Sequence, residues 1–414
     1  MTVGTRIRYM GNKQQLAGEV AVFCESLRDG RRLVDLFGGM GSVAGAAAAS
    51  GRNVWVNDIQ SYAQLATRCL ITSSNEPPPA DSVRRTLLPA YRHNLSALRE
   101  RYATELESER HVLRRGDFEA LRRLQDEWRH AGNDLDVATE VRALRDGHDD
   151  GPWRLATLLF AWGYFGLRQA AELDSIRFAI DHARDHEIID DEQADWLHLA
   201  WLQTASRIAS APGHFAQFLR PTSAAGARRI VAARRRAAWD SLLDDVSTLR
   251  PYGEPAWRAH NRILGQDALT IWRELDALDV GPAIYYADPP YSKDHYSRYY
   301  HVLETLTQYD YPDADGAGRY RPDRFRSTFA VKTEVVGSVR TVAREVAARD
   351  GVLLLSYPST GLLTMQLGID PVVLLGEYFD DVKLAISRAA RHSTLGGRHG
   401  AAGQEVVEYV WAAR

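Results

Sequence analysis

The chain has 414 residues, in which 51 Lys and Arg are balanced by 54 Asp and Glu, giving a formal net charge of −3 at pH 7. This balance excludes a polycation of the histone type, but it leaves open a nucleic-acid enzyme whose positive charge is concentrated in one cleft. Hydrophobic residues make up 45% of the chain and charged residues 25%, which is typical of a folded globular protein. At roughly 100–200 residues per domain, the length predicts two or three structural units.

Cysteine use and hydropathy restrict the class of protein further. The two cysteines, Cys24 and Cys69, are too few for a disulfide framework or a four-thiolate zinc site, so we expect two buried apolar side chains and no metal cofactor. The N-terminus lacks the apolar segment of a secretion signal, and no run approaches the ~18 consecutive apolar residues of a membrane span. These features predict a cytoplasmic protein that does not associate with membranes.

The first α/β stretch covers residues 1–72. Residues 32–37 (RLVDLF) predict a short buried strand, and a glycine-rich turn then leads into an alanine-rich helix that begins near Ser42. Residues 53–58 (NVWVND) predict a second strand, followed by a helix to about Cys69. Because a strand, a helix and a strand follow one another, the two strands should be parallel with a right-handed crossover.

A proline-rich break at residues 73–79 separates this stretch from a long middle region. Leu and aromatic residues at helical spacing occur there at residues 81–129, 152–171, 191–210 and 223–248. We therefore expect residues 73–255 to form a mostly helical insert.

An α/β pattern returns in residues 256–414. Strands are predicted at residues 283–287, 352–357, 383–388 and 405–411, with a helix near residues 333–348. The last two strands alternate apolar with polar side chains and should pair as an antiparallel hairpin with a long connection. Together with residues 1–72, this part is expected to form one α/β domain around a mostly parallel sheet.

The sharpest local signal is the tetrapeptide Asp288-Pro289-Pro290-Tyr291, which directly follows an apolar predicted strand. Two prolines cannot continue a central strand, so the chain must leave the sheet at the strand end where open α/β sheets bind ligands. A planar substrate with an exocyclic amine suits this edge: Asp288 and the Pro289 carbonyl accept its N–H groups, and Tyr291 stacks on its ring. The simpler alternative is a turn that buries Tyr291.

A second signal is the segment Asp35-Leu36-Phe37-Gly38-Gly39-Met40-Gly41, between the first strand and its helix. Its glycines allow a ligand to approach the backbone closely, but their spacing is not the Gly-x-Gly-x-x-Gly of dinucleotide sites. Asp58, which ends the second strand, is placed to accept hydrogen bonds from two ribose hydroxyls. A ligand with a ribose and no diphosphate, such as S-adenosylmethionine, fits these parts; an ordinary glycine-rich turn is the alternative.

These motifs together resemble the Dam-type (D12 class) family of adenine-specific DNA N6-methyltransferases. Residues 9–13 (YMGNK) resemble the family's Tyr-x-Gly-x-Lys segment, residues 37–41 (FGGMG) its Phe-x-Gly-x-Gly methyl-donor loop, residues 57–59 (NDI) its acidic second motif and residues 288–291 (DPPY) its catalytic motif. Residues 265–268 (GQDA) are similar to the segment that places an Asp near the adenine of the donor. The resemblance covers roughly residues 6–72 and 150–411, and no motif is matched in residues 80–150.

The resemblance implies a Rossmann-like class I methyltransferase sheet, with the DNA target-recognition region in residues 73–255. It implies sequence-specific transfer of a methyl group from S-adenosylmethionine to adenine N6 in double-stranded DNA, with the base flipped out of the duplex, in a restriction-modification or phage-defence system. The implied partners are double-stranded DNA and a cognate restriction or defence protein, with the chain a monomer or a dimer. The implied donor-binding residues are Tyr9, Lys13, Asp35, Phe37, Gly38, Gly39, Gly41, Asp58, Ile59 and Asp267, and the implied catalytic residues are Asp288, Pro289, Pro290 and Tyr291.

Two arginine-rich segments are candidates for contacts with DNA phosphates. Five arginines fall within residues 228–236 without an acid, and a second basic run, with Tyr and Phe interleaved, covers residues 319–326. The alternative for both is a solvated surface. The candidate DNA-binding residues are Arg228, Arg229, Arg234, Arg235, Arg236, Lys293, His295, Arg321, Arg324 and Arg398.

Other functions stay open from the sequence alone. Cytosine N4 methylation needs the same chemistry at an exocyclic amine, although Asp288 and the motif order favour adenine. Methylation of RNA or of a protein glutamine amide goes more often with an Asn-Pro-Pro-Tyr pattern. A DNA-binding module that keeps the fold without turnover is the non-enzymatic alternative, and the presence of Gly39, Gly41, Asp58 and Asp288 argues against it.

Overall fold

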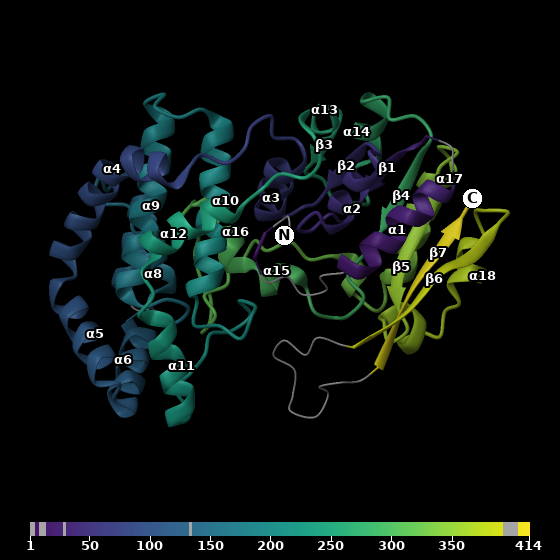
Figure 1. The fold of residues 1–414 in the computed structure, drawn as a ribbon. Helices are drawn as coiled ribbons and strands as arrows, with labels where there is room; N and C mark the ends of the chain where they lie inside the picture. Colours follow the sequence, from purple (N-terminus) through teal and green to yellow (C-terminus); the bar gives the residue numbers. More distant parts are fainter. Residues whose placement is uncertain (1–4, 8–13, 28–29, 132–134, 392–404) are drawn as a thin grey trace.

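One seven-stranded mixed sheet organises the protein, in the order β3-β2-β1-β4-β5-β7-β6 (Figure 1). The structure is a computed structural model that describes residues 5–7, 14–27, 30–131, 135–391 and 405–414. Its strands are β1 (Arg32–Asp35), β2 (Val54–Asn57), β3 (Arg262–Leu264), β4 (Ala283–Ala287), β5 (Val352–Pro358), β6 (Val382–Arg391) and β7 (Glu405–Ala413). Strands β1 to β5 are parallel, whereas β7 is antiparallel to both β5 and β6. The predicted fold class and the C-terminal antiparallel pair are therefore confirmed.

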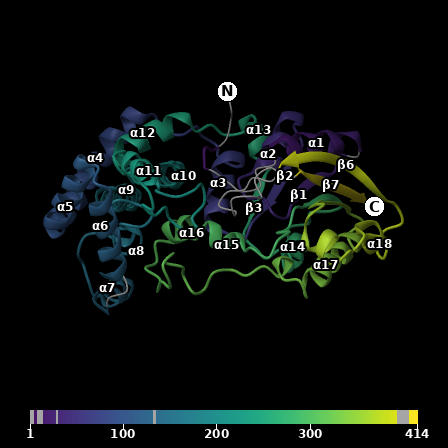
Figure 2. The same ribbon diagram turned by 90° about the horizontal axis from the view of Figure 1, so that it is seen from below.

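Helices cover both faces of the sheet, which explains why its central strands β1, β2, β4 and β5 are almost entirely buried. One layer contains α1 (Gln14–Ser26), α2 (Ser42–Ser50) and α3 (Ser61–Ile71), and the other contains α14 (Trp272–Ala277), α17 (Val335–Ala347) and α18 (Pro371–Leu375) (Figure 2). Successive residues of a strand point to opposite faces, so Leu33 joins the core under the first layer and Val34 the core under the second. Both cysteines are buried and free, as predicted.

The middle of the chain folds into helices that lie beside the sheet, on the left in Figure 1. These are α4 (Ala80–Arg101), α5 (Ala103–Arg115), α6 (Phe118–Ala131), α7 (Leu135–Arg145), α8 (Leu155–Phe160), α9 (Leu167–Asp185), α10 (Asp191–Ile208), α11 (Ala224–Arg234) and α12 (Ala238–Thr248). The helical patterns at residues 152–171 and 223–248 are each divided between two helices. The first breaks where Trp162 has φ 67°, and the second breaks where Arg168 donates to the carbonyls of residues 234–236 and so satisfies the end of α11.

The remaining elements are short helices and turns in residues 255–366. They are α13 (Pro255–Arg258), α15 (Tyr296–Tyr299), α16 (His301–Gln308), a 3₁₀ turn (Thr328–Ala330) and a π turn (Leu362–Gln366). One apolar core runs from the sheet into the helical part, since Val54 and Ile284 belong to the same buried cluster as Trp196 and Leu243. In the described part of the chain, no helix has the length and apolar character that crossing a membrane requires.

Candidate functional site

The carboxyl ends of β1, β2, β3 and β4 meet at one edge of the sheet because these four strands are parallel. From β1 the chain proceeds through β2 and β3 in one direction, and β4 and β5 lie on the other side of β1. The strand order therefore reverses between β1 and β4, and such a switch point opens a crevice above the sheet. The segments after β1, β2, β3 and β4 are those in which these sequence motifs lie.

The glycine-rich turn after β1 is packed directly against β2. The Gly38 N–H donates to the Asn57 carbonyl at 2.8 Å, and a Cβ on Gly38 would come within 2.0 Å of Val56 Cγ1. Gly41 has φ 74°, a left-handed conformation that a side chain would strain. The turn thus needs glycine both for close packing on β2 and for its path into α2.

Asn57 joins three strand ends at this edge. Its side-chain amide donates to the carbonyls of Leu36 at 3.1 Å and Gln266 at 2.9 Å, and its carbonyl oxygen accepts the Gln266 N–H at 2.9 Å. The side chain is 1% exposed, so these bonds are made away from solvent. Asn57 therefore fixes the segment after β3, including Asp267, relative to the segments after β1 and β2.

The carboxylate of Asp58 bridges the turn after β1 and the start of α3. One oxygen accepts the Gly39 N–H at 2.9 Å and the other accepts the Gln60 N–H at 2.9 Å. Each carboxylate oxygen has a second lone pair that can still accept a ligand hydroxyl. Burial is the main cause that raises the pKa of Asp58 to about 6, and the nearby Glu304 carboxylate adds to it, whereas backbone N–H groups of Gln60, Gly39 and Ile59 act to lower it.

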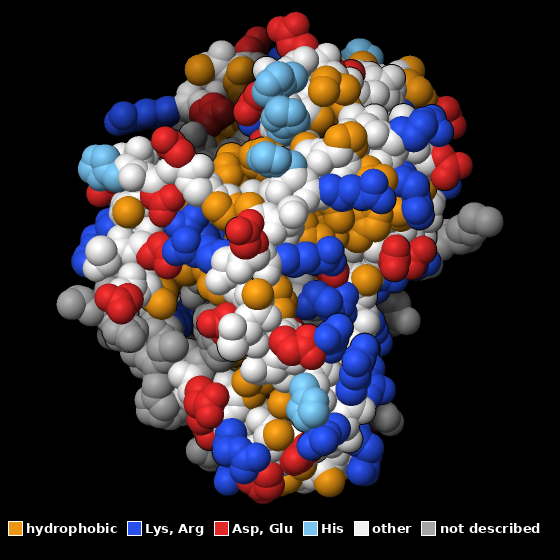
Figure 3. Space-filling view, turned by 90° about the vertical axis from the view of Figure 1, so that its left-hand side faces the viewer, with side chains coloured by type: hydrophobic (Ala, Val, Ile, Leu, Met, Phe, Trp, Pro, Cys, Tyr) orange, Lys and Arg blue, Asp and Glu red, His pale blue; other side chains and the backbone are white. Residues whose placement is uncertain are grey.

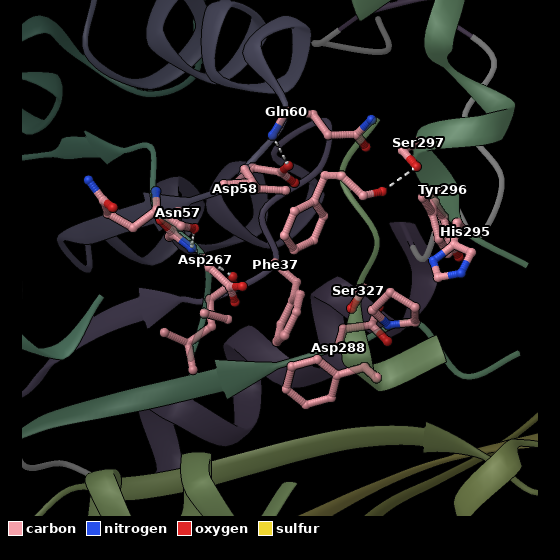
Figure 4. A pocket seen from close by; sticks show the side chains of 17 residues that line it. Phe37, Asn57, Asp58, Gln60, Asp267, Asp288, His295, Tyr296, Ser297 and Ser327 are labelled. Atoms are coloured by element: carbon pink, nitrogen blue, oxygen red, sulfur yellow. Dashed lines mark hydrogen bonds between the residues drawn. The ribbon is translucent and has the colours of Figure 1, made fainter. Parts of the chain in front are cut away.

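A pocket with a cavity volume of about 100 Å³, partly open to solvent, lies above these strand ends (Figure 4). It is lined by residues 36–37, 57–60, 266–268, 288, 290, 295–297, 325, 327 and 329. Three carboxylates (Asp58, Asp267 and Asp288) and no Lys or Arg are among these described residues. An acidic lining of this kind suits a ligand that carries positive charge and disfavours one that carries phosphates.

The predicted catalytic tetrapeptide leaves β4 at the edge of this pocket. Asp288 and Pro290 line the pocket, whereas Pro289 is buried and outside the lining. Tyr291 is half-buried and packs edge-on against Tyr357, with the ring centroids 6.5 Å apart, and its carbonyl accepts the Leu362 N–H. Its ring therefore does not line the pocket in this conformation.

Asp35 lies beneath the pocket rather than in its lining. It is 1% exposed, and one carboxylate oxygen accepts the Phe37 N–H at 3.2 Å. Burial raises its pKa to about 8, and the charges of Asp288 and Asp58 contribute in the same direction. Asp35 is accordingly protonated in most molecules at pH 7.

The side of the pocket opposite Asp58 and Asp267 comes from segments without a recognised motif (Figure 4). The Ser297 hydroxyl donates to the Phe325 carbonyl at 2.6 Å, which holds α15 against the segment before the 3₁₀ turn. Phe329 packs edge-on against Phe37, with the ring centroids 5.2 Å apart. His295 was predicted to contact DNA and lines this pocket. Sequence reasoning missed Asn57, Gln60, Gln266, Tyr296, Ser297, Phe325, Ser327 and Phe329 as lining residues.

The candidate DNA-binding residues differ in their surroundings. Arg228, Arg229, Arg235, Arg236 and Lys293 are exposed, and Arg324 is half-buried over the ring of Tyr320. Two of the predicted phosphate contacts are corrected by the structure, those of Arg234 and Arg321.

Arg234 is 1% exposed and donates to the Trp162 carbonyl at 2.7 Å, and Arg321 is 5% exposed and held by Asp310 and Asp323 at 2.7 and 2.8 Å. To reach a phosphate, Arg234 would have to leave its buried position against Trp162, and Arg321 would have to give up its ion pairs with the exposed Asp310 and Asp323. Tyr9, Lys13 and Arg398 lie outside the described residues. In the described ranges, no cluster of three or more His, Cys, Asp and Glu could hold a metal ion.

Comparison with known proteins agrees with the resemblance seen in the motifs. The family model for the D12 class N6 adenine-specific DNA methyltransferases matches residues 9–142. The match covers the turn after β1 and the Asp58 segment, and it continues into α4–α7, where no motif had been found. It ends before Asp288. The predicted family resemblance is thereby confirmed for the donor side of the pocket.

Several curated proteins are similar to about half of the chain. The type II methyltransferase M.FokI of Planomicrobium okeanokoites is 25% identical over 48% of this chain and 27% of its own length. The modification methylase LlaI of Lactococcus lactis is 21% identical over 50% of this chain and 30% of its own. The type II methyltransferase M.NlaIII of Neisseria lactamica is 23% identical over 49% of this chain and 53% of its own. The chain thus covers about a quarter to a half of these relatives' length. No solved structure matches the chain.

Proposed function

We propose that this protein is a sequence-specific DNA methyltransferase that transfers a methyl group from S-adenosylmethionine to N6 of adenine in double-stranded DNA. The observation that carries the proposal is the convergence of Phe37, Asp58, Asp267 and Asp288 on one acidic pocket at the switch point of the sheet. The family match and the similarity to modification methylases support it from independent evidence. We place the protein in a restriction-modification or phage-defence system on the same grounds.

The residues of the pocket fit S-adenosylmethionine. The free lone pairs of the Asp58 carboxylate suit the ribose hydroxyls, and Phe37 offers an aromatic face for the adenine ring near Asp267. The donor carries a sulfonium and an ammonium group, so three carboxylates and the absence of Lys and Arg among the described lining residues favour it over a nucleotide with a diphosphate. When bound, it supplies the methyl group.

Asp288 acts on the substrate amine, and the carbonyl of Pro289, which lies outside the pocket lining in this conformation, is the second acceptor once the base has entered. The lone pair of an exocyclic aromatic amine is delocalised into the ring, which makes the nitrogen a poor nucleophile. Hydrogen bonds from the amine to these two acceptors favour tetrahedral nitrogen and stabilise the positive charge that develops on it during transfer. Tyr291 stacks on the flipped base once its ring turns from Tyr357 toward the pocket. No nucleophilic side chain is required.

Double-stranded DNA is the proposed partner, and the helical region of residues 73–255 is the proposed target-recognition region. Lys and Arg side chains gather along one side of the helical face of the molecule (Figure 3). Arg228, Arg229, Arg235, Arg236 and Lys293 are exposed candidates for phosphate contacts, and Arg324 is a half-buried one. A duplex held there must release its target base into the pocket, at a cost of a few kcal/mol.

The decisive experiment compares the wild-type protein with Asp288→Ala, with the exposed Asp126→Ala as a matched control. We expect Asp288→Ala to lower the methylation rate by about 10²–10³-fold or more while S-adenosylmethionine still binds, because the change removes an acceptor needed only at the reacting amine. Methylation-aware sequencing of DNA from cells that express each variant gives the base, the position and the recognised sequence. Near-normal activity of Asp288→Ala would contradict the assignment, and methylation at cytosine N4 would establish the principal alternative.

A further inference from the structure

Helix α3 begins next to the donor-binding segment, yet its own sequence does not cap it. Its N-cap residue, Gln60, makes no side-chain hydrogen bond to the first turn, and that turn contains no acidic residue. The first N–H groups of a helix have no partner within the helix and carry a partial positive charge. The start of α3 therefore needs acceptors from another element.

Glu304 of α16 supplies these acceptors, although it is 243 residues away in sequence from Ser61. Its two carboxylate oxygens accept the N–H groups of Ser61 at 3.1 Å and Tyr62 at 3.3 Å. Gln308, one turn further along α16, donates to Glu304 Oε1 at 2.7 Å and so orients the carboxylate. The rings of Tyr62 and Tyr300 also pack together, with centroids 5.6 Å apart.

This contact fixes the segment of residues 58–60 from both ends. Asp58 is joined to the glycine turn through the Gly39 N–H and to the start of α3 through the Gln60 N–H. Glu304 then anchors the first residues of α3 to the helix that follows the catalytic tetrapeptide. These contacts thereby fix the position of the donor side of the pocket relative to its substrate side.

We propose that Glu304 is a positioning residue for the methyl donor, which it serves by capping α3 and holding Asp58 in place to bind the ribose. This inference rests on the proposed function, because it takes the ligand of Asp58 to be S-adenosylmethionine. Glu304 lines no part of the pocket, so its effect on the donor passes through Asp58 and Gln60.

The charge of Glu304 also acts on Asp58. The titratable groups around Asp58 are Glu304 on α16, the buried Asp35 after β1, and Asp267, Asp288 and His295 around the pocket. Glu304 raises the pKa of Asp58, so replacing it with a neutral residue lowers that pKa. The donor is bound by ionised Asp58, so binding weakens as the pH falls through the pKa of Asp58. This loss of affinity at low pH is the acid limb of the binding profile. Loss of the Glu304 charge therefore moves this acid limb to lower pH.

The test measures the Kd of S-adenosylmethionine by calorimetry from pH 5 to 8 for the wild type, Glu304→Gln and Gln308→Ala, with the exposed Glu100→Gln as control. For Glu304→Gln we expect about tenfold weaker binding at pH 8 and an acid limb shifted to lower pH. Gln308→Ala keeps the charge, so it should weaken binding less and leave the acid limb in place. Glu100→Gln should match the wild type.

Amide hydrogen exchange at Ser61 and Tyr62 gives a second readout that needs no ligand. It should accelerate in Glu304→Gln and not in Glu100→Gln, while circular dichroism shows that both variants are folded. Unchanged affinity, acid limb and exchange in Glu304→Gln would overturn this role while wild-type activity left the proposed function intact. A wild-type protein that binds no S-adenosylmethionine would overturn both.

Discussion

Among single residues, the buried carboxyl of Asp35 makes the free energy of unfolding depend on pH. Its pKa is about 8 in the folded protein, against 3.8 for an exposed Asp, and burial is the main cause. Between these values the folded protein keeps a proton that the unfolded chain has lost, so the free energy of unfolding falls as the pH rises through this window. Asn at this position keeps an acceptor for the Phe37 N–H and carries no charge.

We therefore expect Asp35→Asn to be more stable than the wild type at pH 8, by on the order of 1–3 kcal/mol. The advantage should disappear near pH 4, where the folded protein keeps the carboxyl protonated at little cost. Urea unfolding of the two proteins at several pH values measures this difference. A difference that does not change with pH would show that Asp35 does not titrate as its burial requires.

Pocket residues could be predicted from the sequence where a motif places a functional side chain directly after a predicted strand. Phe37, Asp58 and Asp288 each follow an apolar strand closely, so their placement at one edge follows from parallel pairing. Gln266 follows β3, whose three residues give no periodic signal. Phe325 belongs to a segment without regular structure, and its position depends on the Ser297 hydrogen bond rather than on local sequence.

At the scale of elements, the middle and the C-terminal end of α11 show that arginines of one basic run have two different roles. Arg228 and Arg229 are exposed near its middle, whereas Arg234 at its end is buried over the Trp162 ring at 5.7 Å. The charge pattern alone does not separate these cases, since all belong to one acid-free segment. The division follows from the packing of α11 on the segment between α8 and α9.

This division leads to opposite expectations for two variants. Replacing Arg228 and Arg229 with Gln should weaken DNA binding and reduce the slope of log K against log salt by about 0.9 for each phosphate that the variant no longer neutralises, with stability unchanged. Arg234→Gln should instead lower stability by about 1–3 kcal/mol, since it removes the hydrogen bond to the Trp162 carbonyl, and leave the salt slope unchanged. Fluorescence anisotropy over a salt series and thermal unfolding measure the two effects. If the double replacement of Arg228 and Arg229 left the salt slope as it is, the proposed phosphate contacts of α11 would be wrong.

Helix boundaries also depend on contacts that a sequence pattern does not contain. The spacing of apolar residues predicts α3 and α10 well because each is a continuous, largely buried helical segment that ends near a turn signal. It runs across the break between α8 and α9, where no Pro marks the boundary and Trp162 has a φ of 67°. A pattern read along the chain cannot include contacts made across it.

For the whole molecule, the domain division predicted from the sequence and the observed distribution of the apolar core lead to different expectations about unfolding. The sequence divides the chain at residues 73–255, and the points of entry and exit of this region lie together, since the Tyr252 N–H donates to the Leu70 carbonyl at 2.7 Å. A separable insert should then unfold independently. However, Trp196 of the helical part shares a buried cluster with Val54 of the sheet, so the apolar core continues across this boundary.

Because this apolar core crosses the boundary, we expect the sheet and the helical region to unfold in one cooperative transition. Loss of either part would expose the other's share of the core to water, at a cost of about 25 cal/mol for each Å². Thermal unfolding followed by circular dichroism reports mainly on the helices, and hydrogen exchange of β4 reports on the sheet. The two probes should give the same midpoint, and addition of S-adenosylmethionine should raise both midpoints together, although the pocket lies at the sheet edge. Two separate midpoints, with only the sheet responding to the donor, would show instead that residues 73–255 are an independent domain.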